Sequence, residues 1–311
     1  MAQKVTERVS GVTVELSHLD KPFFPDDGIS KGDLIAYYRD IAPRIIPYLR
    51  DRPLVMVRYP DGITGQGIVQ KNVSRHFPGW VSRAEAGKQH GAVCHVVGDK
   101  PATLVYLANQ ACIELHVFLS LLGALDRPDQ LVFDLDPPDE HHFAGACRHA
   151  LSLRELLEDQ LGLPSYVKTT GGKGLHVHVP LRPDDDFDAV RGFARDVARM
   201  LASRCPDELT LEQRKANRGD RLYLDIMRNA YAQTVVAPYA VRARRGAPVA
   251  TPLHWEELSG EISPKQFTIR TIAARLAESG DPWAGMTRHR HGLSGPRGRL
   301  TATAPPGTTA R

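Results

Sequence analysis

Two aspartates in one short apolar segment are the residues best placed to do chemistry. The segment Leu131–Asp136 reads Leu-Val-Phe-Asp-Leu-Asp, and Pro137 ends it. In a β-strand, alternation places Asp134 and Asp136 on the same face, about 6.6 Å apart at Cα. Bare carboxylates at this distance repel each other; a divalent cation removes that cost, and oxygen ligands suit Mg²⁺ or Mn²⁺. Taken alone, the pair fits a solvated acidic turn equally well.

A third carboxylate lies in a second predicted strand, Leu222–Met227, which carries Asp225. If the two strands pair, three carboxylates surround two cations, an arrangement that serves in-line displacement at phosphorus. Alone, Asp225 fits an ordinary acid at a strand end. Arginines, whose planar side chains bind two phosphate oxygens at once, flank it at Arg218, Arg221, Arg228 and Arg242. Any one of them could be a surface residue, but their crowding favours a phosphate site.

A glycine-rich turn, Thr170–Gly174, separates two further predicted strands and precedes His176 and His178. Clustered glycines let backbone N–H groups approach a polyphosphate, and Lys173 adds a positive charge. The turn is not a Walker A loop, because no Ser or Thr follows the lysine. Such turns often only link strands, but Thr170, Lys173 and His176 together favour a nucleotide contact.

Histidines elsewhere carry weaker signals. His116 follows Glu114 in an apolar stretch that we predict to be helical, where a core histidine is the simpler interpretation. Two His/Cys sets lack a familiar zinc-ligand spacing, and we predict no zinc site from them. These sets are His90, Cys94 and His95, and His141, His142, Cys147 and His149.

The elements that position these residues follow from hydrophobic periodicity and turn residues. Further strands are predicted at Val12–Leu16, Leu54–Arg58, His90–Val97, Thr103–Tyr106, Tyr166–Thr170 and Leu175–Pro180. Helices are predicted at Lys31–Leu49, Leu107–Leu122, Phe143–Leu161, Asp184–Arg204 and Thr268–Glu278. Strands and helices interleave irregularly, which indicates a mixed α/β fold without a doubly wound sheet.

Composition is that of an ordinary soluble globular protein, with 42% hydrophobic and 24% charged residues in 311. The apolar run Leu115–Leu125 is too short to span a bilayer, and the first residues lack a signal core. We therefore expect a cytoplasmic protein without membrane association. Its cysteines form no Cys-x-x-Cys pair, so reduced thiols are expected.

The formal net charge of +4 is concentrated at one end of the chain. Residues 286–311 hold five arginines and no acid, which leaves 35 basic and 36 acidic residues in the remainder. Polyanion binding by residues 1–285 must therefore come from local patches. We predict that residues 286–311 form a disordered basic tail.

Together the motifs resemble one family, the polymerase domain of bacterial ligase D in the archaeo-eukaryotic primase superfamily. The resemblance runs from about Val12 to Trp283. It is carried by Leu-Val-Phe-Asp-Leu-Asp-Pro, Gly-Gly-Lys-Gly-Leu-His and Asp-Ile-Met-Arg-Asn, with supporting blocks at Gln70–Asn72, Tyr106–Gln110 and Glu114–His116.

This resemblance implies a primase-polymerase fold, with a mostly antiparallel catalytic sheet flanked by helices and a smaller N-terminal part packed against it. The implied domain is 1–285, with an N-terminal part of about 1–100 and a catalytic part of about 101–285. The implied activity is nucleotidyl transfer that fills gaps and extends DNA ends carrying a 5′-phosphate in non-homologous end joining or related repair, with a preference for ribonucleotides. NTPs or dNTPs would be the substrates, with two Mn²⁺ or Mg²⁺ ions.

Residue roles are implied in the same way. Asp134, Asp136 and Asp225 would hold the metals, and His116 would lie at the catalytic centre. Lys71, Thr170, Lys173, His176, Arg218, Arg228 and Arg242 would contact the nucleotide. Lys21 and Lys31 would hold the 5′-phosphate of DNA.

The chain departs from the family where Ile68 and Val69 replace two aromatics. Base stacking is worth about 1–3 kcal/mol per base, so contacts there would be weaker. No ligase module is apparent, so a separate DNA ligase and a Ku-type end-binding protein are expected partners, near the nucleoid. Two alternatives remain open: a non-catalytic module that binds DNA ends, and a manganese-dependent glycosyltransferase that uses the Asp-x-Asp pair.

Overall fold

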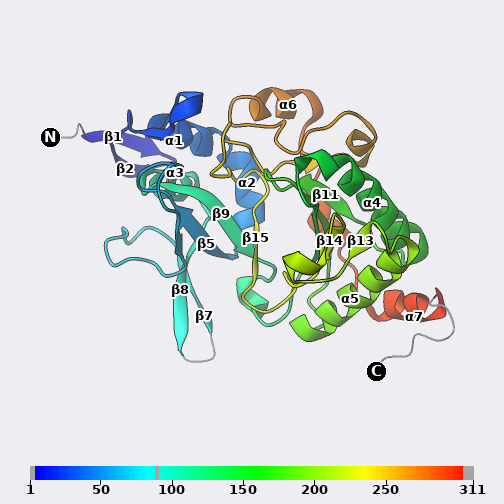
Figure 1. The fold of residues 1–311 in the computed structure, drawn as a ribbon. Coiled ribbons are helices and arrows are strands. Elements are labelled where there is room, and N and C mark those ends of the chain that lie inside the picture. Colours follow the sequence, from blue (N-terminus) through cyan, green and yellow to red (C-terminus); the bar gives the residue numbers. More distant parts are fainter. Residues whose placement is uncertain (1–3, 88–90, 304–311) are drawn as a thin grey trace. The chain divides into compact units, whose positions relative to one another are not determined.

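A computed structural model describes residues 4–87 and 91–303. The chain forms two compact units that interleave along the sequence (Figure 1). Unit 1 comprises residues 1–123, 234–251 and 265–281, and unit 2 comprises residues 124–233, 252–264 and 282–311. Both contain sheets and helices, which confirms the mixed α/β class. The predicted boundary near residue 100 is wrong, because residues 101–123 and two later segments belong to unit 1.

Unit 1 contains a sheet with the strand order β15-β9-β5-β8-β7, with β6 also paired to β5, and two small hairpins, β1-β2 and β3-β4. Its strands are β1 (Lys4–Val9), β2 (Val12–Ser17), β3 (Pro22–Phe24), β4 (Ile29–Ser30), β5 (Pro53–Arg58), β6 (Ile68–Gln70), β7 (Arg83–Gly87), β8 (Ala92–Val97), β9 (Cys112–Phe118) and β15 (Thr234–Val236). Its α-helices are α1 (Lys31–Asp40), α2 (Ala42–Leu49), α3 (Pro101–Asn109) and α6 (Ile272–Ser279).

The predicted helix over residues 31–49 is two helices. Ser30 caps α1 in a reciprocal capping box with Asp33, as its position before the apolar stripe predicts. The break comes at Ile41, two residues before Pro43, which occupies the first turn of α2. Proline is tolerated there because its missing N–H would have no partner in a first turn, whereas inside a longer helix it would remove a hydrogen bond.

Two predictions around residue 110 are wrong. Residues 103–106 lie in helix α3, and Glu114 and His116 lie on strand β9. Nearly all residues of both elements are buried, so neither shows the alternation or the stripe from which secondary structure is predicted.

Unit 2 is built on a sheet with the strand order β13-β14-β10-β12-β11-β16. Its strands are β10 (Gln130–Asp136), β11 (Tyr166–Thr169), β12 (Leu175–Pro180), β13 (Leu209–Thr210), β14 (Leu222–Asp225) and β16 (Pro252–Leu253). Its helices are α4 (Phe143–Glu155, continued by a π-turn over Leu156–Gln160), α5 (Phe187–Arg204) and α7 (Ser294–Thr303). All pairings except β13 with β14 are antiparallel, which confirms the predicted mostly antiparallel sheet.

The two faces of the unit 2 sheet differ in chemistry. Leu131, Phe133 and Leu135 of β10 are fully buried, and α4 and α5 pack against this strand. Asp134 and Asp136 point to the other face, as alternation requires. The register places His176 of β12 and Asp225 of β14 on either side of Asp134, so one face of the sheet collects the ionisable residues.

The predicted disordered tail is wrong for residues 286–303. Residues Met286–His289 form a 3₁₀ turn, and Ser294–Thr303 form α7. Arg290 donates to the buried Asp129 at 2.8 Å, and Arg297 donates to Asp185 at 2.9 Å. These arginines therefore pair with acids of unit 2 and are not a free basic segment. Residues 304–311 lie outside the described residues.

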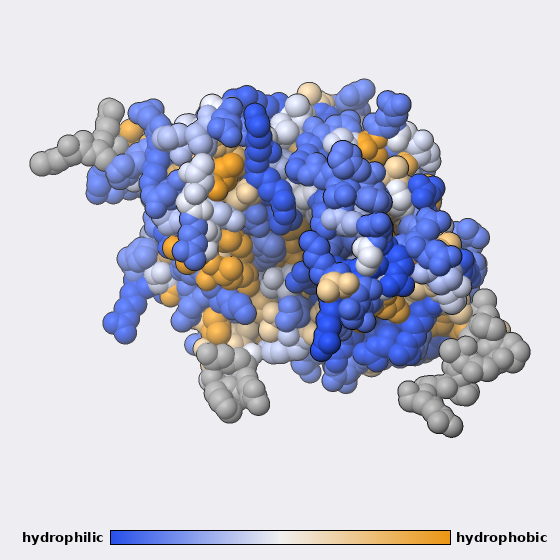
Figure 2. Space-filling model, viewed as in Figure 1, coloured by the Kyte–Doolittle hydropathy of each residue, from blue (hydrophilic) through white to orange (hydrophobic). Residues whose placement is uncertain are grey.

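Hydrophilic residues cover most of the face shown in Figure 2, with small apolar patches between them. Within the described ranges, no helix is both long and apolar enough to cross a membrane. The four cysteines are all free thiols.

Candidate active site

Three carboxylates meet on the polar face of the unit 2 sheet. Asp225 is the direct partner of Asp134 in the antiparallel ladder, and Asp136 is opposite Tyr223. Directly opposed side chains on adjacent antiparallel strands have Cβ atoms about 4.5–5.5 Å apart. Side chains of Asp134 and Asp225 are only 17% and 13% exposed. The pairing predicted from the sequence is therefore present.

Basic side chains surround these carboxylates. The Asp136 carboxylate lies 3.0 Å from Nζ of Lys173 and 3.4 Å from Nη1 of Arg218. Arg228 reaches both other acids, with its Nε 3.7 Å from Asp225 and 3.9 Å from Asp134. Three of the predicted phosphate contacts thus lie beside the predicted metal ligands.

Asp225 is held by two donors within its own strand region. The backbone N–H of Met227 donates to its carboxylate at 2.7 Å, and the Tyr223 hydroxyl donates at 3.1 Å. Burial nevertheless raises the pKa of Asp225, and the negative charge of Asp134 adds to the rise. Two ionised carboxylates side by side repel each other, and a bound cation would remove this repulsion.

Tyr223 is a site residue that the sequence analysis missed. Its ring lies under the Arg218 guanidinium, 3.8 Å from the ring centroid, while its hydroxyl contacts Asp225. Burial, together with Asp225, raises its pKa, so it acts as a neutral donor. Tyr223 lies two residues before Asp225 in a strand, so alternation places both on the same face, and this spacing could have identified it from the sequence.

The glycine-rich turn closes against the end of β10. Thr170 Oγ1 accepts from the Gly172 N–H at 3.2 Å, and Lys173 donates to the Pro138 carbonyl at 3.1 Å. A Cβ on Gly174 would lie 2.2 Å from the carbonyl oxygen of Leu135, so only glycine fits there. This close approach brings Lys173 to Asp136.

His176 continues the site along β12. Its Nε2 lies 3.5 Å from Asp134, and its side chain is 6% exposed. The ring of His178 lies 5.8 Å from that of His176, and its Nδ1 is 2.9 Å from the Gln130 side-chain oxygen. His176 therefore lies beside the carboxylates, whereas His178 is part of the adjoining core.

The donor set suits a hard divalent cation, because the three carboxylates offer only oxygen and share one face. Across the described part of the chain, no three His, Cys, Asp or Glu side chains are already arranged as a metal site. At the aspartates this agrees with their ion pairs to Lys173, Arg218 and Arg228, which a cation would replace in part. Of the residues weighed for zinc, His90 lies outside the described residues.

His116 and Arg242 meet in unit 1, joined by Glu114. The Glu114 carboxylate lies 3.0 Å from Nε2 of His116 and 3.2 Å from Nε of Arg242. It also accepts from the N–H of Ala243 at 3.0 Å. Burial works to raise the pKa of Glu114, but the hydrogen bond from His116, the charge of Arg242 and this N–H together lower it to about 2. Glu114 is thus an ionised link that the sequence analysis did not identify as functional.

Lys21 and Lys31 are neighbours in unit 1. The N–H of Lys31 donates to the Lys21 carbonyl at 2.8 Å, and Lys31 Nζ donates to the Ser17 carbonyl at 2.6 Å. Burial, followed by the charge of Lys21, lowers the pKa of Lys31 to about 8. Lys21 pairs with the exposed Asp61 at 2.9 Å. Two adjacent cations of this kind suit a doubly charged phosphate.

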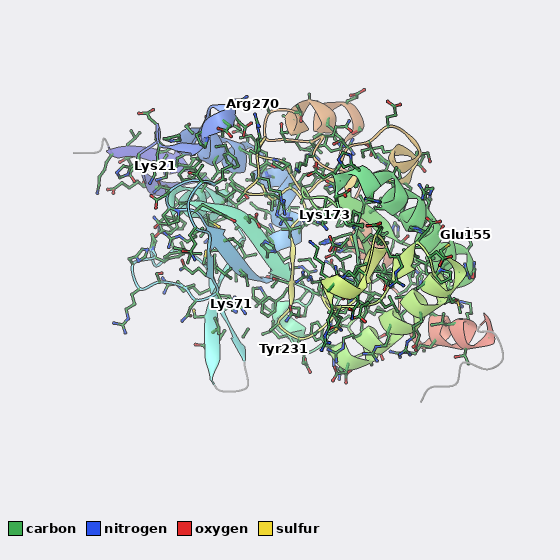
Figure 3. All side chains as sticks on the ribbon, viewed as in Figure 1. Lys21, Lys71, Glu155, Lys173, Tyr231 and Arg270 are labelled. Carbon is green, nitrogen blue, oxygen red and sulfur yellow. The ribbon has the colours of Figure 1, made fainter. Side chains whose placement is uncertain are left out.

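Lys71 follows β6 and lies apart from Lys21 within unit 1 (Figure 3). The preceding residues, Ile68 and Val69, are 50% and 63% exposed. The positions that depart from the aromatic pattern are therefore surface positions.

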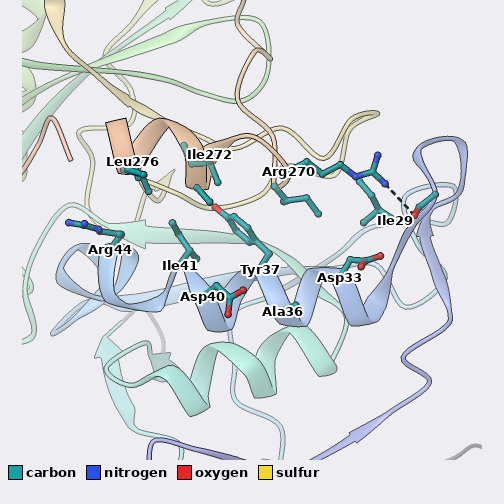
Figure 4. A pocket seen from close by; sticks show the side chains of 14 residues that line it. Ile29, Asp33, Ala36, Tyr37, Asp40, Ile41, Arg44, Arg270, Ile272 and Leu276 are labelled. Atoms are coloured by element: carbon teal, nitrogen blue, oxygen red, sulfur yellow. Dashed lines mark hydrogen bonds between the residues drawn. The ribbon is translucent and has the colours of Figure 1, made fainter. Parts of the chain in front are cut away.

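A separate pocket of about 590 Å³ lies between α1 and α6 in unit 1 (Figure 4). Ile29, Ile41 and Leu276 form part of its apolar lining, and Arg270 at its edge donates to the Asp27 carbonyl. None of the predicted site residues lines this pocket.

Comparison with known proteins decides the family. The family described as LigD, primase-polymerase domain, matches residues 30–283. The chain belongs to this family. Among the curated LigD relatives, the bifunctional non-homologous end joining protein of Bacillus subtilis is 32% identical over 277 residues, or 89% of the chain. The multifunctional protein of Pseudomonas aeruginosa is 33% identical over 291 residues, or 92% of the chain.

A solved LigD structure agrees with this assignment. It is the polymerase domain of Mycobacterium tuberculosis ligase D in complex with DNA, with a TM-score of 0.81 and 28% identity. The match covers 94% of this chain and 99% of that one. The curated LigD proteins are longer: the chain spans 44% of the Bacillus protein and 34% of the Pseudomonas protein.

Proposed function

We propose that the chain is a nucleotidyltransferase that adds nucleotides to DNA 3′ ends at gaps and breaks during non-homologous end joining. The observation that carries this proposal is the register of β10 and β14, which sets Asp225 opposite Asp134 with Asp136 two residues further on. The LigD family match supports the same reaction class. The Mycobacterium tuberculosis relative, solved in complex with DNA, supports DNA as the substrate.

In this reaction the 3′-hydroxyl loses its proton to solvent, its oxygen forms a bond to the α-phosphorus of a nucleoside triphosphate, and the bond from that phosphorus to the departing pyrophosphate breaks. Two Mn²⁺ or Mg²⁺ ions, held by Asp134, Asp136 and Asp225, would supply Lewis-acid stabilisation of the charge at phosphorus. Lys173 and Arg218, which pair with Asp136, and Arg228 would turn to the phosphates and neutralise their charge. Thr170 and His176 would contact the same nucleotide.

The roles proposed for the remaining residues rest on the family resemblance. Glu114 fixes His116 and Arg242 in one cluster, which would serve the nucleotide sugar and phosphates. Lys21 and Lys31 would bind the 5′-phosphate on the far side of a gap, and Lys71 would add a phosphate contact. We further propose a preference for ribonucleotides, and action with a separate ligase and a Ku-type protein at the nucleoid.

The test is nucleotide incorporation by Asp134→Asn, which keeps the shape of the side chain and removes its charge. The substrate is a one-nucleotide gap with a 5′-phosphate, offered with NTPs or dNTPs and with Mn²⁺ or Mg²⁺. We expect the rate to fall by ~10²–10³-fold or more, the usual effect of losing one preorganised electrostatic group. In the wild-type protein, the incorporation rates with NTPs and dNTPs test the proposed preference for ribonucleotides, and the rates with Mn²⁺ and Mg²⁺ show which metal supports the reaction.

The matched control is Asp159→Asn, an exposed aspartate in the π-turn after α4. It should incorporate nucleotides at the wild-type rate. Full activity of Asp134→Asn would overturn the metal assignment. Tight binding of gapped DNA by the wild type without any incorporation would favour the non-catalytic end-binding module.

A further inference from the structure

We propose that a groove beside α5 binds the sugar-phosphate backbone of a single nucleic-acid strand next to the carboxylates. This α5 groove has a volume of about 360 Å³, and it lies between the helix and the end of β14 in unit 2. Arg191, Arg195 and Arg199 line one side, and Leu211, Ile226 and Met227 line the other. The inference deepens the proposed function and rests on it, since it assigns a strand-binding surface to the same sheet.

The three arginines form a regular ladder. They are four residues apart on an 18-residue helix, so they share one stripe, and each step rises by ~6 Å along the axis. In a stacked strand, successive phosphates rise by ~3.4 Å along the axis, so every second phosphate rises by about one step of the ladder. A single bound phosphate would need cations that converge on one point, whereas these stand in a row.

The charges of the ladder can be exchanged for phosphates. Arg191 pairs with Asp188 at 2.7 Å and Arg199 with Asp196 at 3.6 Å, and both aspartate side chains are at least 60% exposed. Exposed ion pairs within a helix are weak. Over residues 4–87 and 91–303, Arg195 makes no ion pair within 4 Å. A polyanion that binds these arginines would therefore replace only weak, exposed ion pairs.

The opposite wall of the groove is mostly apolar, with Gln213 as its polar amide, and at Met227 it adjoins Asp225. Met227 is 36% exposed, and its backbone N–H donates to the Asp225 carboxylate at 2.7 Å. Tyr223, the aromatic residue of this wall, is only 6% exposed, so its ring is not open for base stacking. Sugars can pack on Met227 and Leu211 while phosphates face the arginines, which predicts binding without sequence preference.

The test uses a fluorescein-labelled 20-nucleotide oligo-dT and measures fluorescence anisotropy over a salt series. The variant is the triple change Arg191→Gln, Arg195→Gln and Arg199→Gln, which keeps helix propensity and polarity. We expect its affinity at low salt to fall by ~10- to 100-fold, and the slope of log K against log salt to become shallower by ~2, or ~0.7 for each lost phosphate contact. Circular dichroism checks that the variant is folded.

A matched control removes three arginines of unit 2 that do not line the groove: Arg148→Gln, Arg154→Gln and Arg204→Gln. Its salt slope should stay at the wild-type value. An equal change in both variants would show a general charge effect and overturn the proposal, as would an unchanged slope in the ladder variant. Displacement of oligo-dT by poly-aspartate at equal charge concentration would also overturn it, in favour of an acidic peptide.

Two results distinguish failure of the groove from failure of the proposed polymerase activity. If the wild type binds oligo-dT through the ladder but never extends a primer, the polymerase proposal fails and the groove stands. If it extends primers while the ladder variant binds oligo-dT as the wild type does, the groove fails and the polymerase stands.

Discussion

Glu114 offers the sharpest test of how unit 1 is held together. Its side chain is 9% exposed, and its carboxylate lies within hydrogen-bonding or ion-pair distance of His116, Arg242 and the Ala243 N–H. Despite burial, these three partners lower its pKa from an ordinary 4.5 to about 2. At ~1.36 kcal/mol per pKa unit, the ionised carboxylate contributes roughly 3 kcal/mol to folding.

The perturbation is Glu114→Gln, which keeps the size of the side chain and removes its charge. We expect it to lower the free energy of unfolding at pH 7 by about 2–4 kcal/mol, because Arg242, whose side chain is 18% exposed, loses the carboxylate charge that lies 3.2 Å from its Nε. Urea unfolding followed by circular dichroism measures the difference. The expected loss of activity would follow from displacement of His116 and Arg242.

The pH dependence has a definite sign. Because the folded-state pKa is depressed, the stabilisation by Glu114 is complete above about pH 4.5 and declines as the pH falls towards 2. The gap between wild type and Glu114→Gln should therefore shrink on acidification. Glu256→Gln is the control, since that side chain is 78% exposed and 4.0 Å from Arg154, and it should change stability by less than ~0.5 kcal/mol. A gap below 1 kcal/mol at pH 7, or one that is constant with pH, would refute the reasoning.

Two further predictions concern the remaining contacts. Burial and the charge of Lys21 lower the pKa of Lys31 to about 8, so Lys31 loses its positive charge above pH 8. The ratio of the affinity for 5′-phosphorylated gaps to the affinity for unphosphorylated gaps should therefore fall above pH 8, by up to ~10-fold per pH unit. A ratio that is constant from pH 7 to 9.5 would contradict this. Gly174→Ala places a Cβ 2.2 Å from the Leu135 carbonyl oxygen and should cost about 1–3 kcal/mol of stability, together with nucleotide incorporation. Gly123→Ala, with no atom within 4 Å, is its control, and equal effects would count against the packing argument.

Much of unit 2 could be predicted from residue patterns. The β10 and β12 segments and the helix ending at Arg204 follow from alternation or a clear apolar stripe. Alternation also placed Asp134 and Asp225 on strand faces where they could meet, but the pairing that brings them together was only a condition of the hypothesis. Lys173 and Arg228, expected near the nucleotide phosphates, lie 3.0 Å and 3.7 Å from the carboxylates of Asp136 and Asp225. Their roles towards nucleotide and metal stay predictions.

Other features could not be predicted, for physical reasons. The register of β15 with β9, which joins residues 234–236 to residues 116–118, depends on long-range pairing that no local pattern encodes. The ordering of residues 286–303 depends on partners such as Asp129 and Asp185, far away in sequence. A composition rich in Gly, Pro and Arg is typical of disordered segments. The prediction failed because composition does not reveal the distant acids with which these arginines pair.

The contrast between β10 and β9 explains why the first strand could be predicted from its residue pattern and the second could not. A strand shows a period of two only when its faces meet different surroundings, and β10 has a hydrocarbon core on one face and ionisable groups on the other. Strand β9 is mostly buried on both faces, with Glu114 held by the half-buried His116 and Arg242, so its polar residues fall among apolar ones without a solvent face. The polar face that makes unit 2 suitable for phosphate chemistry is therefore the same feature that left an alternation in the sequence. Where an ionised residue is held inside a core, as Glu114 is, its partners are seen in its contacts and cannot be inferred from sequence spacing.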